Sequence, residues 1–224
     1  MDIVLNGLKR LGAFYADKHF VLKSGKHSEA YINPDVALMY PSVVHEAAQL
    51  MAWPFKDERR DIVCVGPAFG GNFMAWSVAE VLGRFSGYDI RWVATAKSPG
   101  GGFIIEPDRG FEDLLLGGAE PASVLVAEDL LTTGGSVKEL ISSLSDYFVK
   151  FIGVTVMVNR GGVTAEDLGV PVLHSAANIT VETDEPRFCR WCAMERPIVE
   201  DVGHGLEYKL AHPDYVGGYI KLLS

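Results

Sequence analysis

Two adjacent carboxylates, Glu128 and Asp129, lie in the stretch VLVAEDLLTTGGS, and small or hydroxylated residues follow them: Thr132, Thr133, Gly134, Gly135 and Ser136. Such a run suits a phosphate, because small residues let an anion approach the backbone N–H groups and the hydroxyls add donors. The carboxylates would repel that anion, so we expect them to accept hydrogen bonds from hydroxyl groups or to help hold a cation. A ligand with a phosphate next to a pair of hydroxyl groups would satisfy both halves of the stretch, and ribose 5-phosphate is such a ligand.

The neighbouring sequence places this run between a strand and a helix. Val124 to Ala127 is an unbroken apolar run, which is typical of a parallel strand covered on both faces. After the run, apolar residues recur at the spacing of one helix face: Val137, Leu140, Ile141, Leu144, Tyr147, Phe148 and Phe151. A helix N-terminus offers unpaired N–H groups and the positive end of the macrodipole. An ordinary strand-to-helix turn with capping residues has the same spacing, so both interpretations stay open on these residues alone.

A second glycine-rich loop has the same setting. Asp61 to Val65 reads as a strand, the loop GPAFGG follows at Gly66 to Gly71, and a helical pattern continues through Val78 and Leu82. Two such loops at the carboxyl edge of one sheet are what a doubly wound α/β domain uses to form a ligand crevice. The sequence therefore predicts a mostly parallel sheet flanked by helices.

The composition indicates a globular protein and argues against a general nucleic-acid-binding protein. At 224 residues the chain suits one domain with a substantial core, and its 48% hydrophobic content is that of a folded protein. The net charge of -9 argues against a nucleic-acid binder, which needs a basic face. No apolar stretch has the length of a membrane span, and the start MDIVLNGLKRLG lacks the order of a signal peptide. We expect a cytoplasmic protein without membrane contact.

The stretch Val124 to Ser136 resembles the phosphoribosyl-diphosphate (PRPP) signature of the type I phosphoribosyltransferases. That signature is an apolar strand, two acidic residues, two variable positions and a small-residue loop. The resemblance implies that Glu128 and Asp129 hold the ribose 2- and 3-hydroxyls, with Thr132 to Ser136 around the 5-phosphate. It implies that pyrophosphate lies against the other loop, at Ala68, Phe69, Gly70 and Gly71. The nucleotide-binding P-loop is a different motif, and its GxxxxGK string does not occur.

The stretch FVLKSGKHSEAYINPD, Phe20 to Asp35, reads by itself as a surface hairpin. It also resembles the N-terminal motif of the orotate phosphoribosyltransferases. The resemblance implies that Lys23 reaches the substrate and that the backbone around Tyr31 and Ile32 contacts the pyrimidine. Many relatives have an aromatic residue where Ile32 stands, so the base is expected to pack differently here.

Arg160 follows a strand-like run, Phe151 to Val158. An arginine at a strand end is often just a solvated charge. In the orotate enzymes, an arginine at this place binds the orotate carboxylate by a bidentate fork. The resemblance therefore implies that Arg160 selects orotate. Asn159 replaces the usual aspartate, which is expected to alter how the arginine is held.

Ala96 to Gly118 contains three successive glycines and reads as a mobile hairpin or lid. The orotate enzymes carry a flexible catalytic loop here that closes over the neighbouring subunit's site. Many of them have two lysines and a His-Gly, and this sequence lacks the second lysine and the histidine. It is more similar to a subgroup matched by Ala96-Lys97, Gly100 to Gly102 and Asp108 to Phe111. The resemblance implies that Lys97 and Arg109 are the cations for pyrophosphate, acting catalytically with Asp129.

The resemblance covers roughly residues 14–177 and implies an orotate phosphoribosyltransferase, which converts orotate and PRPP to orotidine 5-monophosphate and pyrophosphate. Mg²⁺ would be held mainly by PRPP, with no direct protein ligand. The implied organisation is a phosphoribosyltransferase domain at 1–177, with a hood at about 14–40 and a lid at about 96–118. A C-terminal extension at 178–224 would pack on the same domain. The site would be completed in a homodimer that shares its lids.

Two other functions stay open. An adenine-type transferase has a similar signature, although nothing explains why it would keep the LKSG hairpin and Arg160. A non-catalytic PRPP-sensing regulator should carry a basic DNA-binding module, for which the short acidic N-terminus gives no room.

Cys189 and Cys192 form a CxxC beyond the resemblance. They can be half of a zinc site, with His204 and His212 as possible partners, but the usual zinc-finger spacing is absent. A packed tail with two reduced thiols is the favoured interpretation. Cys64, inside the apolar run DIVCV, is expected to be a small core residue.

Overall fold

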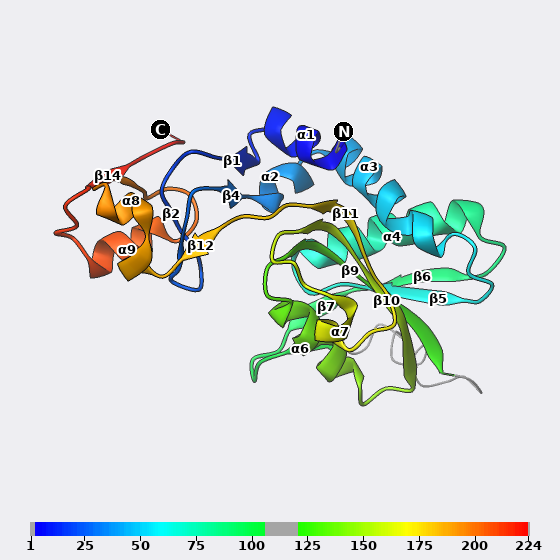
Figure 1. Cartoon of the computed structure of the whole chain (residues 1–224). Coiled ribbons are helices and arrows are strands. Elements are labelled where there is room, and N and C mark those ends of the chain that lie inside the picture. Colours follow the sequence, from blue (N-terminus) through cyan, green and yellow to red (C-terminus); the bar gives the residue numbers. More distant parts are fainter. Residues whose placement is uncertain (1–2, 106–120, 224) are drawn as a thin grey trace. The chain divides into compact units, whose positions relative to one another are not determined.

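A computed structural model describes residues 3–105 and 121–223. The chain forms two compact units (Figure 1). We call Met1–Val4 with Ala37–Ile179 the sheet unit, and Leu5–Val36 with Thr180–Ser224 the terminal unit. Each unit is described by itself. The predicted boundary between the domain and its extension, at residue 177, stays a prediction. In the structure, residues 180–224 belong to the same compact unit as residues 5–36.

A five-stranded parallel sheet is the centre of the sheet unit. Its strands are β5 (Ile62–Val65), β6 (Ile90–Val93), β9 (Ala122–Leu131), β10 (Val149–Asn159) and β11 (Leu173–Asn178). Their order is β11-β10-β9-β5-β6, so the first strand of this sheet in the sequence, β5, lies beside the third, β9. This is the order of a doubly wound sheet, and the predicted fold class is confirmed.

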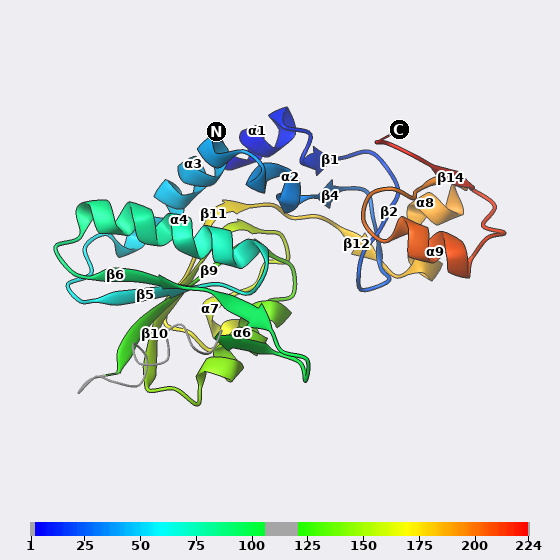
Figure 2. The ribbon, with the colours of Figure 1, turned by 180° about the vertical axis from the view of Figure 1, so that it is seen from behind.

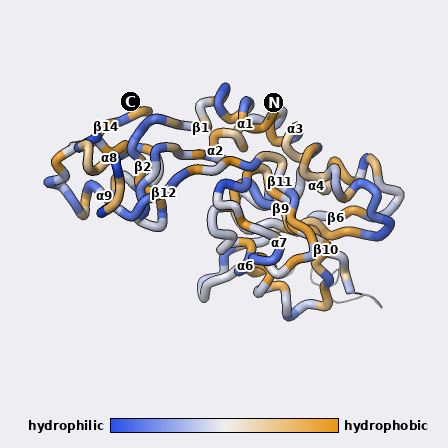
Figure 3. Tube along the Cα trace, in the orientation of Figure 1, coloured by the Kyte–Doolittle hydropathy of each residue, from blue (hydrophilic) through white to orange (hydrophobic). Residues whose placement is uncertain are grey.

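Helices cover both faces of this sheet (Figures 1 and 2). On one face lie α3 (Pro41–Ala52), which the 3-10 turn η1 (Trp53–Phe55) extends, and α4 (Gly70–Phe85). On the other lie α6 (Gly135–Leu144) and α7 (Ala165–Leu168), whose apolar side chains pack with Val124, Val126 and Val156. A strand buried on both sides must be apolar throughout, and Figure 3 shows β9 and β10 as largely hydrophobic.

Two of these elements differ from their predicted bounds. The strand predicted to end at Ala127 continues to Leu131, so Glu128 and Asp129 lie inside β9. The reason is that β9 stays paired with β10 to its end, with Leu131 opposite Asn159. The predicted helix face does not continue to Phe151, because α6 ends at Leu144 and β10 begins five residues later.

The terminal unit is built from very short strands. Strand β1 (Phe14–Tyr15) pairs with β4 (Tyr31–Ile32), and β3 (His27–Ser28) pairs with both β2 (Phe20–Val21) and β12 (Thr183–Asp184). The β2–β3 pair confirms the predicted hairpin. The rest comprises β13 (Ile198–Val199), β14 (Tyr219–Ile220), η2 (Pro186–Phe188), α8 (Arg190–Ala193) and α9 (Gly205–Ala211).

The chain passes between the two units within α1 (Ile3–Arg10), in the segment before α3 that holds α2 (Pro34–Leu38), and after β11. In the part of the chain that the structure describes, no helix combines the length and apolar character needed to cross a membrane.

Candidate functional site

The sheet has its topological switch point between β5 and β9. The helix after β5, α4, packs on one face, and the helix after β9, α6, packs on the other (Figure 1). The two loops at the carboxyl ends of these strands therefore diverge, and a crevice forms at such a point in open α/β sheets. The predicted phosphate loop and the predicted pyrophosphate loop are the two loops that border it.

The loop from Gly66 to Gly71 lies directly against the acidic end of β9. Val65 is paired with Val126, and a Cβ atom at Gly66 would lie 2.5 Å from the carbonyl oxygen of Ala127. A Cβ atom at Gly70 would overlap the carboxylate of Asp129. At Gly71, a Cβ would lie 3.1 Å from Oε1 of Glu128. Glycine is required here because the loop backbone approaches the carboxylate pair so closely.

The loop after β9, predicted to bind phosphate, leads directly into α6. Gly134 caps the helix in the left-handed region with φ 74°, and a Cβ there would lie 2.8 Å from Leu168 Cδ2, so two constraints select glycine. Thr133 Oγ1 accepts a hydrogen bond from the Gly135 N–H at 3.4 Å. The predicted phosphate ligands Thr132, Thr133, Gly135 and Ser136 are exposed. Hydroxyls, N–H groups and the helix dipole thus face solvent together.

The carboxylate pair is electrostatically unfavourable without a ligand. Glu128 is 6% exposed, and its Oε1 accepts a hydrogen bond from the Asp129 N–H at 3.1 Å. Burial raises the pKa of Glu128 well above its usual value, and the charge of neighbouring Asp129 raises this pKa further. A hydroxyl donor or a cation bound beside the pair would relieve this repulsion.

The residues after β10 are fixed against the phosphate loop. The Arg160 N–H donates to the Leu131 carbonyl oxygen at 2.8 Å, and a Cβ at Gly161 would overlap the Thr132 carbonyl. The Asn159 side chain donates to the Val163 carbonyl at 2.8 Å and accepts from the Val163 N–H at 3.2 Å. A carboxylate could not donate to that carbonyl, so asparagine has a structural role where the resembled enzymes have aspartate.

Lys97 lies at the exposed end of a hairpin made of β7 (Thr95–Lys97) and β8 (Phe103–Ile105). Phe103 and Ile105 are buried against α6, and the Phe103 N–H donates to Ser143 Oγ at 3.0 Å. Arg109 and the rest of the predicted lid after Ile105 lie outside the described residues.

Two polar residues that the sequence interpretation missed join this hairpin to the pyrophosphate loop. The Thr95 hydroxyl donates to the Gly66 carbonyl at 2.6 Å. Asn72, in the first turn of α4, donates to the Thr95 carbonyl at 2.8 Å and accepts from the Thr95 N–H at 3.0 Å. Two features of the sequence could have indicated them: Thr95 lies at the end of a predicted strand, and Asn72 directly follows the glycine-rich loop.

The predicted orotate contacts Lys23, Tyr31 and Ile32 belong to the terminal unit. Lys23 is exposed in the turn between β2 and β3. Ile32 is buried, and the Tyr31 ring lies 5.7 Å from that of Phe20. Within the sheet unit, the structure brings together the two loops, the acidic pair and the Arg160 backbone, and it describes Lys23, Tyr31 and Ile32 within the terminal unit.

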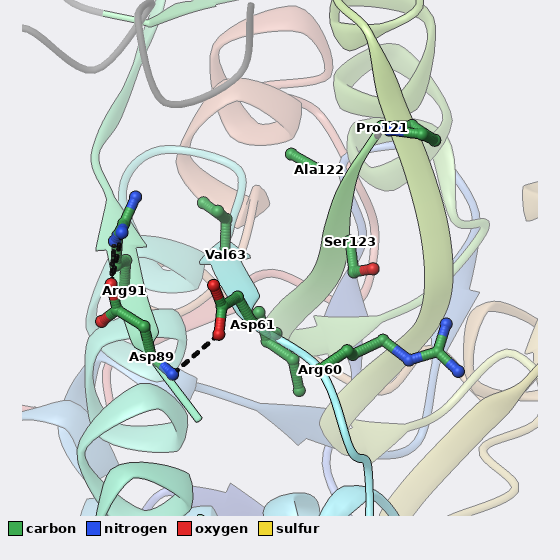
Figure 4. A pocket seen from close by; sticks show the side chains of 9 residues that line it. Arg60, Asp61, Val63, Asp89, Arg91, Pro121, Ala122 and Ser123 are labelled. Carbon is green, nitrogen blue, oxygen red and sulfur yellow. Dashed lines mark hydrogen bonds and ion pairs between the residues drawn. The ribbon is translucent and has the colours of Figure 1, made fainter. Parts of the chain in front are cut away.

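A pocket of about 310 Å³ lies at the opposite edge of the sheet, at the amino ends of β5, β6 and β9 (Figure 4). Its charges already have partners, because Arg91 Nε donates to Asp89 Oδ2 at 2.6 Å and the Asp89 N–H donates to Asp61 Oδ1 at 3.0 Å. Ligands of open α/β sheets bind at the carboxyl edge, so this pocket is separate from the candidate site.

Comparison with known proteins agrees with this geometry. Orotate phosphoribosyltransferase from Caldicellulosiruptor bescii is 35% identical over 182 residues, which cover 81% of this chain and 87% of that enzyme. The Thermotoga maritima enzyme of the same name is 30% identical over 200 residues, covering 89% and 97%. The chain belongs to the orotate phosphoribosyltransferase family. No protein-family model matches it.

Solved structures of the family share its fold. Orotate phosphoribosyltransferase from Aeropyrum pernix has a TM-score of 0.56 at 23% identity, over 79% of this chain and 94% of that one. The Mycobacterium tuberculosis enzyme in complex with PRPP has a TM-score of 0.56 at 20% identity, with the same coverage of 79% and 94%.

The raised pKa of Glu128 leads to a prediction about stability. The unfolded chain loses this proton more easily than the folded protein, so stability falls as the pH rises above the ordinary glutamate pKa of about 4.3. Glu128→Gln should remove that loss and stabilise the protein at pH 7.5 by on the order of 1 kcal/mol. Denaturant unfolding at several pH values measures this difference, which should vanish near pH 4.

Glu139→Gln, on the exposed face of α6, is the matched control and should change stability little at any pH. A Glu128→Gln protein that is less stable than the wild type at pH 7.5 would contradict the electrostatic description of the pair.

Proposed function

We propose that the protein transfers the phosphoribosyl group of PRPP to orotate, forming orotidine 5-monophosphate and pyrophosphate. The observation that carries the proposal is the carboxylate pair between two glycine loops at the switch point of the sheet, in a chain of this family. The loop at the start of α6 would match the 5-phosphate of PRPP, the carboxylates its ribose hydroxyls, and the loop from Gly66 to Gly71 its pyrophosphate.

In this proposal the loop from Thr132 to Ser136 holds the 5-phosphate. Its exposed hydroxyls and the N–H groups at the start of α6 are donors, and the helix dipole favours negative charge. Asp129 and Glu128 accept hydrogen bonds from the two ribose hydroxyls. Their repulsion in the unliganded protein would then be offset by these donors, which makes the pair selective for a diol.

Pyrophosphate lies against Ala68 to Gly71, the loop whose glycines bring its backbone close to the carboxylate pair. Lys97 and Arg109 provide positive charge for the leaving group. Mg²⁺ is the proposed cofactor, and the adjacent carboxylates are the hard oxygen donors that fit a site near it, although PRPP and water hold the ion mainly. When bound, the ion supplies further charge neutralisation.

Arg160 binds the orotate carboxylate in a bidentate fork, and Lys23 with the backbone of Tyr31 and Ile32 contacts the base. Arg160 is suited to this role because its backbone is fixed to Leu131, beside the phosphate loop. A planar guanidinium can match both carboxylate oxygens at once.

The protein needs little acid or base catalysis for this reaction, because orotate arrives as an anion and pyrophosphate leaves as one. Binding aligns the base with the ribose carbon and removes the entropy cost of their encounter. The transition state should resemble an oxocarbenium ion, and the site stabilises charge around it.

We further propose a cytoplasmic homodimer with lids shared between subunits. The three cysteines are free thiols, as expected in a reducing compartment. Phe69, Phe73 and Trp76 are exposed at helical spacing on one face at the start of α4, beside the pyrophosphate loop. A subunit contact would cover this apolar stripe and bring a neighbouring lid to the site.

The reaction is tested by loss of orotate absorbance with PRPP and Mg²⁺, with adenine, uracil and hypoxanthine as parallel controls. We expect turnover of orotate alone. Arg160→Ala should raise the KM for orotate by about 10- to 100-fold, since a hydrogen bond to a charged group is lost, and leave PRPP binding intact. Arg160→Lys keeps the charge without the fork and should recover little. Unchanged orotate kinetics in Arg160→Ala would contradict the assignment of the base site.

Light scattering on a sizing column tests the dimer. Trp76→Glu should give monomers with at least about tenfold lower activity, because it places a charge in the apolar contact. Phe85→Glu, at the exposed far end of the same helix, is the matched control and should stay dimeric. Mixing inactive Arg109→Ala and Asp129→Asn subunits should restore activity if lids are shared. A fully active monomer would contradict the proposal.

A further inference from the structure

Four potential metal ligands meet in the terminal unit, from segments far apart in the chain. We call them the terminal cluster: His19, His27, Cys189 and Cys192. Their ligand atoms all lie within 4.8 Å of one another. The histidines are on the β2–β3 hairpin or directly before it, and the cysteines are at the start of α8 and inside it. His204 and His212, the partners that the sequence suggested for the CxxC, are not members of this cluster.

We propose that the terminal cluster binds one structural zinc ion. Tetrahedral zinc with bonds of about 2.0–2.1 Å to nitrogen and about 2.3 Å to sulfur requires ligand atoms roughly 3.3–3.8 Å apart. Cys192 Sγ lies 3.2 Å from His27 Nδ1 and 3.7 Å from His19 Nε2. Cys189 Sγ lies 3.5 Å from His19 Nε2. The two imidazole nitrogens, 2.8 Å apart, would separate by roughly half an ångström on binding.

An outer contact orients His19 for a metal. His19 Nδ1 lies 3.0 Å from the Arg196 carbonyl oxygen, to which it donates when it carries the proton. That hydrogen bond leaves the lone pair of Nε2 facing the cluster, as is usual for metal-binding histidines.

The chemistry of the donors selects zinc. Two thiolates and two neutral imidazoles give a total charge of −2, which Zn²⁺ balances, so no net charge is buried. His19, His27 and Cys189 are buried and Cys192 is half-buried. A tetrahedral set of two sulfurs and two nitrogens is typical of zinc, and with all four positions filled by protein the site is structural.

The terminal unit has little regular secondary structure to stabilise it. Its strands are two residues long each, and one buried apolar cluster consists of Phe20, Val199 and Val202, besides other buried apolar side chains such as Leu8 and Ile32. Ion pairs from Lys26 to Glu185 and from Arg190 to Glu29 join the same two segments but are partly exposed and weak. A small unit of this kind usually needs a metal or a disulfide. Zinc would join the hairpin that carries Lys23 to the C-terminal segment.

The direct test is the metal content of the full-length protein, purified without chelator from zinc-supplemented cells. We expect inductively coupled plasma mass spectrometry to find about one zinc ion per chain. Cobalt added to the reduced, zinc-free protein should give thiolate-to-cobalt charge transfer and the intense visible bands of tetrahedral Co²⁺. A strong chelator should lower Tm by several degrees, and zinc should restore it, because metal binding is coupled to folding.

Variants assign the ligands. Cys192→Ser and His27→Gln should lose zinc, whereas Cys64→Ala in the sheet unit and His204→Gln in the terminal unit should keep it. If the ligand variants fail to fold, the zinc content and cobalt spectrum of the wild type decide. Absence of both signals in the wild type would overturn the proposal, leaving a hydrogen-bonded cluster. A Cys189–Cys192 disulfide, or zinc retained by both folded ligand variants, would also overturn it.

Discussion

The candidate site depends on the close approach of the backbone after β5 to the acidic end of β9. At Gly66, Gly70 and Gly71 a single added carbon would meet β9 atoms from Ala127 to Asp129, so no side chain separates the loop from the carboxylates. This approach follows from the parallel pairing of Val65 with Val126, which sends both strands out at the same edge. The two carboxylates and the two loops therefore share one crevice, and a ligand in it must contact all of them.

The same constraint holds two carboxylates close together. Glu128 is buried next to Asp129, and burial and repulsion both raise its pKa. Such a pair lowers stability, and it persists where function needs it. Paired hydrogen bonds hold the surrounding backbone. The Asn72 side chain both donates to and accepts from the Thr95 backbone, and the Asn159 side chain does the same with the Val163 backbone. These contacts hold the backbone close in sequence to Lys97 and Arg160.

Local patterns were enough to predict the parts of this site that are contiguous in sequence. The acidic pair, the Thr-Gly loop and the GPAFGG loop each lie within a few residues, and their strand-to-helix setting could be read from apolar periodicity. The end of β9 was mispredicted, because pairing with β10 and not local composition decides how far a strand continues. The support from Asn72 to Thr95 was missed for the same reason: it joins a helix to a strand across the fold.

The terminal cluster shows this limit most clearly. CxxC was visible in the sequence, but nothing local distinguishes His19 and His27 from the other histidines of the chain. Strand pairing within the terminal unit brings the hairpin to the C-terminal segment, since β3 pairs with both β2 and β12. Contacts between such distant segments are set by tertiary structure, which periodicity does not encode.

Calorimetric titration of PRPP into wild-type, Gly70→Ala and Gly83→Ala proteins tests the central claim most directly. Both glycines lie in α4, but a Cβ at Gly83 meets open space, whereas one at Gly70 overlaps the Asp129 carboxylate. We predict that the wild type and Gly83→Ala bind PRPP equally well. Gly70→Ala should fold and bind PRPP about tenfold or more weakly, a loss of about 1.4 kcal/mol or more. Equal PRPP affinity in all three proteins would contradict the account of the crevice.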